Sequence, residues 1–178
     1  MKQNQKLKKL MKTNNPQAIV IHHEAGNNGF NAVNQMHRQK WNFVSSLGFY
    51  IGYQYYINKD GILYKGREET DEGAHTLGGW NRKSIGICLM GNFEFEHPAQ
   101  KQLDTLEKLI VDIQERRNIL DTEIYGHREL WPTKCPGKFL FLWLTNFRKT
   151  NKLESKINKL QKILISLLTQ LLNKLSGK

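Results

Sequence analysis

Two short apolar runs rich in β-branched residues constrain the fold of this 178-residue chain more than any other feature. They cover residues 17–25 and 84–90, and each is followed by a turn that contains glycine and asparagine. Runs of this length and composition are typical of strands buried inside a sheet. A sheet that contains such strands must be covered, so the remaining segments have to supply its other strands and its helical layers.

The segments between and after these runs fit that requirement. Residues 49–57 are aromatic and β-branched, which predicts a third strand. The turn at 58–61 contains Asp-Gly, a strong hairpin signal, so residues 62–67 are expected to pair with that strand. We further expect a short strand at residues 122–125 and helices at residues 31–41, 98–117 and 139–147. This order predicts an α/β fold with a mixed central β-sheet flanked by helices.

The positive charge of the chain is confined to its two ends. The formal net charge is +11, and residues 1–15 contribute five lysines without an acidic residue. Residues 148–178 contain eight Lys or Arg and one Glu, whereas residues 16–147 contain 14 basic and 15 acidic residues. We therefore expect a basic N-terminal arm (1–15), a nearly neutral domain (16–147) and a basic C-terminal segment (148–178). Basic tails favour an anionic partner such as a membrane, nucleic acid or an acidic cell-envelope polymer, and a merely solvated tail is the alternative.

The C-terminal segment predicts an added amphipathic helix. Its apolar residues follow a heptad pattern: Leu153, Ile157, Leu160, Leu164, Leu167 and Leu171. Lys152, Lys156, Lys159 and Lys162 lie off this stripe, and from Ile163 onward the apolar surface is wider than a coiled-coil seam requires. Such a helix could lie in an anionic membrane interface, associate with a second copy, or dock on its own domain.

The two ends lack the signals of export or membrane insertion. Residues 1–15 have no apolar region of the kind found in signal peptides, so we expect a chain made in the cytoplasm without a secretory signal. No apolar run approaches 18 residues, which argues against a transmembrane helix. Cys88 lies in an apolar run and is expected to be buried, while Cys135 lies in a polar loop, so the two do not resemble a disulfide framework.

The loop Gly126–Gly137 holds two candidate metal ligands. His127 and Cys135 are eight positions apart, and prolines stiffen the loop. Zinc sites use at least three protein ligands, and the best source of a third is the strand that carries His22 and His23. Neighbouring side chains on a strand point to opposite faces, so only one of these two histidines can face a shared site.

Four segments of the chain resemble the zinc-dependent N-acetylmuramoyl-L-alanine amidases, the family that includes small phage amidases and peptidoglycan recognition proteins. They are residues 19–23, 51–67, 73–93 and 126–137, in the family's order, and the resemblance covers about residues 16–147 but neither tail. It implies the corresponding mixed α/β fold.

The resemblance also implies one Zn²⁺ per chain, held by His22, His127 and Cys135. Three protein ligands leave a fourth position for water, which is the mark of a catalytic zinc site. A zinc ion held in this way lowers the pKa of its water and polarises the substrate carbonyl. Recognition proteins without catalytic activity usually lack the cysteine, which this chain has.

Two further residues match positions that assist catalysis in the family. Tyr53 is implied to orient the water or to stabilise the oxyanion, although a packing role among the neighbouring aromatic residues is the alternative. Thr133 lies two residues before the cysteine, where some phage members have lysine. Because threonine carries no positive charge, it cannot supply the electrostatic role of that lysine.

Other residues border the substrate groove in relatives. The resemblance makes Arg67, His75 and Asn81 candidates for contact with the glycan or the stem peptide. Trp41 and Trp80 could stack on a sugar ring, with packing as an equal alternative.

We therefore expect a peptidoglycan-binding enzyme that hydrolyses the amide between N-acetylmuramic acid and L-alanine. Its size, the absence of a signal peptide and the cationic tails favour a cell-wall-lysing endolysin that reaches the wall at host lysis. The alternatives are a cytoplasmic amidase that recycles muropeptides and a peptidoglycan-binding module without catalysis. Nucleic acid is not an expected partner, because the body is nearly neutral and contains no nucleic-acid motif.

Overall fold

The computed structural model describes residues 13–176, so most of the predicted N-terminal arm lies outside the described residues. The strands are β1 (Ala18–His23), β2 (Tyr55–Ile57), β3 (Leu63–Lys65), β4 (Ser84–Leu89) and β5 (Ile124–Gly126). The helices are α2 (Phe30–Trp41), α3 (Gln100–Arg117) and α4 (Lys138–Leu175), with three 3-10 turns, η1 (Trp80–Arg82), η2 (Asp121–Glu123) and η3 (His127–Glu129).

The five strands form one sheet in the order β3-β2-β4-β1-β5. β1 is parallel to both β4 and β5, β2 is parallel to β4, and the hairpin partner β3 is antiparallel to β2. This arrangement confirms the predicted mixed sheet and the hairpin at its edge. β1 lies between two neighbours with all six residues buried, so the end of this strand is a rigid place from which to present a side chain.

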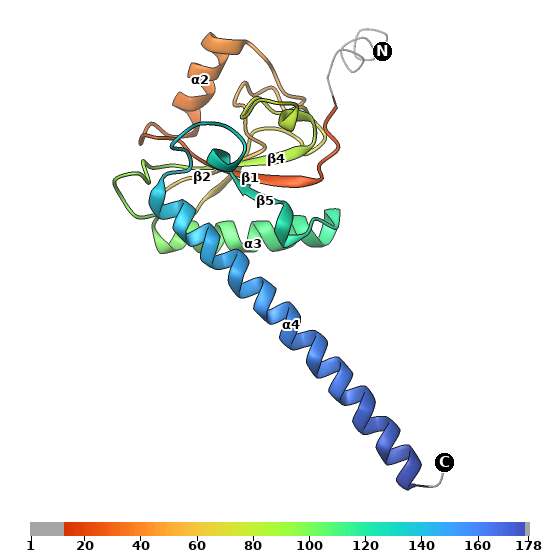
Figure 1. The fold of residues 1–178 in the computed structure, drawn as a ribbon. Helices are drawn as coiled ribbons and strands as arrows, with labels where there is room; N and C mark the ends of the chain where they lie inside the picture. The colour runs from red at the N-terminus through yellow and green to blue at the C-terminus, as the bar shows by residue number, and fades with distance from the viewer. Residues whose placement is uncertain (1–12, 177–178) are drawn as a thin grey trace, which may run out of the picture.

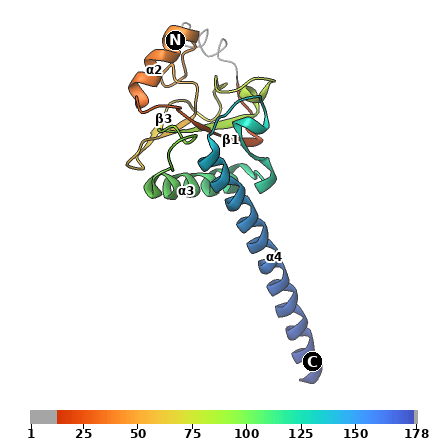
Figure 2. The same ribbon diagram turned by 60° about the vertical axis from the view of Figure 1, so that its left-hand side comes forward.

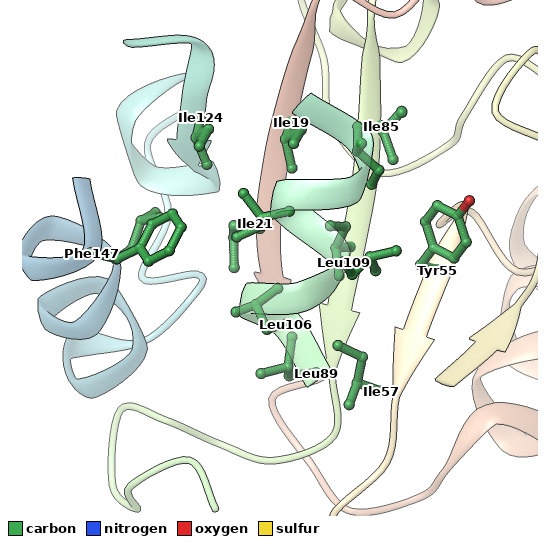
Figure 3. Packing of buried hydrophobic residues seen from close by; sticks show 14 of the residues in the cluster. Ile19, Ile21, Tyr55, Ile57, Ile85, Leu89, Leu106, Leu109, Ile124 and Phe147 are labelled. Atoms are coloured by element: carbon green, nitrogen blue, oxygen red, sulfur yellow. The ribbon is translucent and has the colours of Figure 1, made fainter. Parts of the chain in front are cut away.

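Helices cover both faces of the sheet, and the two faces have separate apolar cores (Figure 1). On one face, Ile19 and Ile21 of β1 pack with Leu106 of α3 and Phe147 of α4 (Figure 3). On the other face, α2 packs with Tyr56 of β2, Cys88 of β4 and their neighbours. The alternation along β1 therefore places His22 on the α2 face and His23 on the other, so the two histidines point to opposite faces as the sequence pattern predicts.

The predicted strand at residues 49–57 is wrong for its first half, because only Tyr55–Ile57 are in the sheet. The amides of Tyr50 and Ile51 instead donate to the Asn34 side chain at 2.6 and 3.0 Å, and the Gly52 amide donates to His37 Nδ1 at 2.8 Å. Side chains of α2 thus satisfy donors that a neighbouring strand would otherwise bind. This loop is the segment that carries Tyr53.

The predicted helix at 139–147 and the predicted C-terminal helix are one continuous helix, α4, of 38 residues. At 1.5 Å per residue it is about 57 Å long. Its first turns bury Leu140, Leu144 and Phe147 in the core, whereas the part beyond Asn151 projects away from the domain (Figures 1 and 2). The alternative that this helix docks on its own domain is therefore wrong. No helix within residues 13–176 is long and apolar enough to cross a membrane.

Candidate metal centre and cleft

The three predicted ligands meet at one place. His22 comes from the end of β1, His127 from the start of η3 and Cys135 from the loop that follows, and their ligand atoms lie within 4.8 Å of one another. Cys135 Sγ is 3.6 Å from His22 Nδ1. Zinc bonds of about 2.1 Å to nitrogen and 2.3 Å to sulfur at a tetrahedral angle place two ligands about 3.6 Å apart. The spacing of this pair therefore fits a shared zinc ion.

His23, the other candidate on the strand, points away from the cluster. Its Nδ1 accepts a hydrogen bond from the Phe93 amide at 3.2 Å on the opposite side of the sheet. Its own backbone amide donates to Cys135 Sγ at 3.4 Å, so the main chain of β1 helps to hold the cysteine. The structure thus places His22, and not His23, in the cluster with His127 and Cys135.

Backbone hydrogen bonds fix the loop that carries the other two ligands. The Arg128 amide donates to the Cys135 carbonyl at 2.8 Å, and the Arg128 guanidinium donates to the Lys134 carbonyl. Gly137 has φ +87, and a Cβ there would lie 2.3 Å from the Phe93 carbonyl carbon. Only glycine suits a left-handed position this close to another backbone, so the Pro-Gly end of the loop fixes where Cys135 sits.

A second histidine, His75, lies within hydrogen-bond distance of the His22 ring on the side away from Cys135. His22 Nε2 lies 3.0 Å from Nδ1 of His75. If His22 Nδ1 faces a metal, its Nε2 must carry the hydrogen and donate it to His75, an arrangement common to metal-binding histidines. Gly73 and Gly86 make room for the His75 ring, because a Cβ on either would lie within 2.6 Å of it.

The electrostatics of the cluster suit a cation. Burial and the neighbouring histidines hold the pKa of His22 well below its usual value, and burial lowers the pKa of His127. Both rings are therefore neutral near pH 7, which is the form that binds metal. Burial raises the pKa of the Cys135 thiol to about 12, and a bound zinc ion would offset this by stabilising the thiolate. His127 Nε2 is buried without a hydrogen-bond partner among the described residues.

The cluster opens into a cleft of about 780 Å³. Aromatic side chains form much of its wall: Trp41, Phe43, Tyr53 and Trp131. Lys40 and Glu72 place one charge of each sign on the lining. A pocket with apolar walls and a few polar groups is the usual form of a site for a small ligand or a polymer segment.

Tyr53 stands beside the cluster, with its ring centroid 5.1 Å from that of His22. It also packs against the core on the α2 face, so the alternative packing role is met as well. Burial raises the pKa of its phenol well above 10, with a smaller contribution from Cys88. Tyr53 therefore keeps its proton at neutral pH and can donate a hydrogen bond.

Thr133 lines the cleft but its hydroxyl already has a partner. Thr133 Oγ1 accepts a hydrogen bond from the Cys135 amide at 3.2 Å. This contact caps the turn that presents the cysteine. A lysine at the same position could not accept that bond.

The expectation that Arg67 contacts substrate does not match its position. Its side chain has no exposed surface, and its guanidinium donates to the carbonyls of Ile51, Glu72 and Phe43 at 2.7, 3.2 and 2.5 Å. Arg67 instead ties together three backbone segments around the cleft. Burial lowers its pKa to about 10, so it stays charged at neutral pH.

His75 and Asn81 do line the cleft, and Asn81 has a clear structural task. Asn81 Oδ1 accepts from the amides of His75 and Thr76 at 2.9 and 3.1 Å, and its Nδ2 donates to the Thr76 carbonyl at 2.8 Å. Trp41 is part of the cleft, whereas Trp80 packs on Tyr125 with centroids 5.2 Å apart and is not among the residues that line it.

Sequence reasoning missed several lining residues, among them Lys40, Phe43 and Trp131. Lys40 and Phe43 reach the cleft only because α2 packs across the sheet, and no local pattern marks them. Trp131 had an available signal, since it lies within the loop that carries two of the predicted ligands.

Comparisons with known proteins agree with this geometry. The family model described as N-acetylmuramoyl-L-alanine amidase (Amidase_2) matches residues 12–138. Peptidoglycan-recognition protein SC2 of Drosophila melanogaster is 37% identical over 123 residues, which cover 66% of this chain and 66% of that protein. The N-acetylmuramoyl-L-alanine amidase LysC from Clostridium intestinale URNW superposes with a TM-score of 0.66 at 34% identity, over 78% of this chain and 87% of that one.

A third relative was solved with a ligand. Peptidoglycan recognition protein-LE, in complex with tracheal cytotoxin, a monomeric diaminopimelic acid-type peptidoglycan, superposes with a TM-score of 0.62 at 26% identity. The superposition covers 72% of this chain and 79% of that one. Because the family model spans more than half of the sequence and includes all three residues of the cluster, this chain belongs to the N-acetylmuramoyl-L-alanine amidase family.

Proposed function

We propose that this protein is a zinc-dependent amidase that hydrolyses the bond between the lactyl group of N-acetylmuramic acid and L-alanine in peptidoglycan. The observation that carries the proposal is the cluster of His22, His127 and Cys135 at the base of an open cleft. Three ligands with one side open to solvent are the arrangement of a catalytic rather than a structural zinc site.

Bound zinc would supply a Lewis acid and a water whose pKa lies near neutrality. The chain's own residues do the rest. His22 and His127 stay neutral and keep lone pairs for the metal, and His75 fixes which nitrogen of His22 is free. The protonated phenol of Tyr53 donates a hydrogen bond to the carbonyl oxygen as negative charge develops on it. Thr133 holds the turn of Cys135 and adds no charge.

The cleft supports a peptidoglycan substrate. Its aromatic walls offer flat surfaces for sugar rings, and Lys40 can pair with a carboxylate of the stem peptide. The complex of the related recognition protein with tracheal cytotoxin supports the same class of ligand.

We further propose that the enzyme is an endolysin that acts on the intact cell wall. The basic tails support this role, because walls and envelopes are anionic. A recycling amidase is the rival within the same chemistry, and the rates on polymeric wall and on soluble muropeptide separate the two. An endolysin degrades both, whereas a recycling enzyme is active only on the soluble fragment.

The direct test combines metal analysis with mass spectrometry of digested peptidoglycan. We expect one zinc per chain, release of intact stem peptides with a free L-alanine amino group, and loss of both in Cys135→Ala. His97→Ala is the matched control, because His97 is exposed and lies outside the cleft and the cluster. Retained zinc and hydrolysis in Cys135→Ala would refute the ligand assignment. A protein that binds zinc and peptidoglycan without releasing peptides would be a recognition module instead.

A further inference from the structure

The projecting part of α4 leaves a large apolar surface in solvent. Eleven leucine and isoleucine side chains between Leu153 and Leu175 are exposed, with 76% of Leu175 accessible. Soluble monomers rarely display contiguous apolar patches larger than a few hundred Å² unless the patch binds something. Within residues 13–176 the domain does not cover this surface. The two partners to compare are an anionic surface and a second copy of the helix.

The apolar side chains gather on one side of the helix. At 100° per residue they fill an arc of about 160°, from Leu167 on one edge to Ile165 on the other, with Ile163 alone outside it. The exposed lysines Lys152 and Lys162 lie on the opposite side. An arc this wide is typical of helices that lie in a membrane interface and is broader than the narrow seam of a coiled coil.

The charge on the helix opposes a second copy as the partner. The sequence contains five lysines and no acidic residue from 155 to 178. Coiled coils fix their pairing by opposite charges beside the apolar seam, and beyond Glu154 two copies of this segment offer only positive charge. An anionic surface supplies the missing counter-charge to the same lysines.

We propose that residues 152–175 of α4 bind an anionic phospholipid bilayer and lie in the plane of its surface. The apolar arc enters the boundary between headgroups and acyl chains, and the lysines remain among the anionic headgroups. The segment is about 36 Å long at 1.5 Å per residue, long enough to carry this contact without the domain. The proposal does not depend on the amidase activity, because it rests on the charge and exposure of this helix alone.

The test uses the full chain with vesicles of phosphatidylcholine, with and without about one third phosphatidylglycerol. We expect flotation with the anionic vesicles at least tenfold more strongly than with the neutral ones. The variant Leu164→Gln/Leu171→Gln should lose at least tenfold in binding. Ser166→Gln/Asn173→Gln, which makes the same kind of change on the polar side, should bind within twofold of the unaltered chain. Urea unfolding of each variant, compared with that of the unaltered chain, reports that its domain is folded.

Two results would overturn the proposal. Equal binding to neutral and anionic vesicles would remove the role of the lysines. A stable oligomer in sedimentation velocity that ignores anionic vesicles, and that Leu164→Gln/Leu171→Gln converts to a monomer, would assign the apolar arc to a second copy.

Discussion

The two ring nitrogens of His22 face different partners, and this division shows how much of the site one residue can determine. Nδ1 lies beside Cys135 Sγ, and Nε2 lies beside His75. His75 in turn has space for its ring only because Gly73 and Gly86 lack a Cβ. Two glycines therefore make room for His75, and His75 in turn contacts the His22 ring of the proposed metal site.

Replacing His75 should weaken zinc binding without removing a ligand. We expect His75→Ala to lower zinc affinity by about 10–100-fold, because His22 then loses the acceptor that fixes its tautomer and ring orientation. Competition with a chromophoric chelator at pH 7 measures the change. His75→Asn, which keeps an acceptor, should recover part of the affinity, and unchanged zinc affinity in the alanine variant would rule out this positioning role.

Removing the phenol of Tyr53 should affect turnover and spare the metal. Tyr53→Phe keeps the ring that packs beside His22 but loses the hydrogen-bond donor. Loss of one oxyanion donor typically lowers kcat by about 10²–10³-fold. Steady-state kinetics on a soluble muropeptide, with zinc content measured in parallel, check this. A variant with normal kcat would leave Tyr53 as a packing residue only.

The cluster of His22, His127 and Cys135 could be predicted from sequence, but the residues that support it could not. Strand alternation predicts that only one of His22 and His23 faces the cluster, and the family resemblance identifies that one as His22. Arg67 was a candidate for contact with substrate, yet its side chain is buried. Its burial depends on three carbonyl groups brought together by distant loops, and no local pattern encodes such a convergence.

At the level of elements, the succession of strands and helices along the chain and the hairpin followed from apolar periodicity and turn residues, whereas the order of the strands within the sheet was not predicted. The failure at residues 49–54 has a specific cause: side chains of α2 take the place of a strand partner. The continuity of α4 was also missed, because a change from a buried to a solvated environment within one helix resembles an element boundary in the sequence. The residue composition of a segment depends on whether the segment is buried or exposed as well as on its conformation, so a change in composition within α4 does not mark the end of the helix.

The ion pairs between Glu69 and two arginines at the end of α3, Arg116 and Arg117, should stabilise the fold to an extent that depends on pH. Burial alone would raise the pKa of Glu69, but hydrogen bonds from Arg116, Tyr55 and Arg117 lower it to about 2. A carboxyl with a depressed folded-state pKa stabilises the fold above its unfolded pKa, near 4.3, and this contribution is lost as pH falls toward 2. Glu69 holds both arginines of the α3 C-terminus.

We therefore expect Glu69→Gln to lower the free energy of unfolding by about 2 kcal/mol at pH 7. The difference in free energy of unfolding between the unaltered chain and Glu69→Gln should fall to less than half of its pH 7 value at pH 3. Urea unfolding at both pH values measures it. Glu68→Gln is the control, because among residues 13–176 Glu68 forms its ion pair with the exposed Lys65. A Glu69→Gln difference that stays constant from pH 7 to pH 3 would contradict the assignment.

Considered as a whole, the molecule separates a nearly neutral domain from a strongly basic helix. Salt should therefore act on the two parts differently. Raising NaCl from 50 to 500 mM shortens the Debye length from about 14 to 4 Å. Over this range of NaCl the rate of hydrolysis of a soluble muropeptide should change by less than twofold, while the affinity for anionic vesicles should fall at least tenfold. Parallel assays of one preparation test this, and equal salt sensitivity of both would contradict the separation.

Because α4 is one continuous helix, it fixes the rotational orientation of the domain relative to any surface that binds the C-terminal half of the helix. Because the same helix is packed into the core at Leu144 and exposed from Leu153 onward, its angular setting on the domain determines the direction in which the cleft opens above a surface. One residue inserted after Asn151 would rotate the cleft by about 100° about the axis of α4 relative to the exposed part of the helix. Seven inserted residues would return the cleft to within about 20° of its original orientation. Access of the cleft to a polymer therefore depends on the rotational orientation that α4 imposes as well as on the length of the helix.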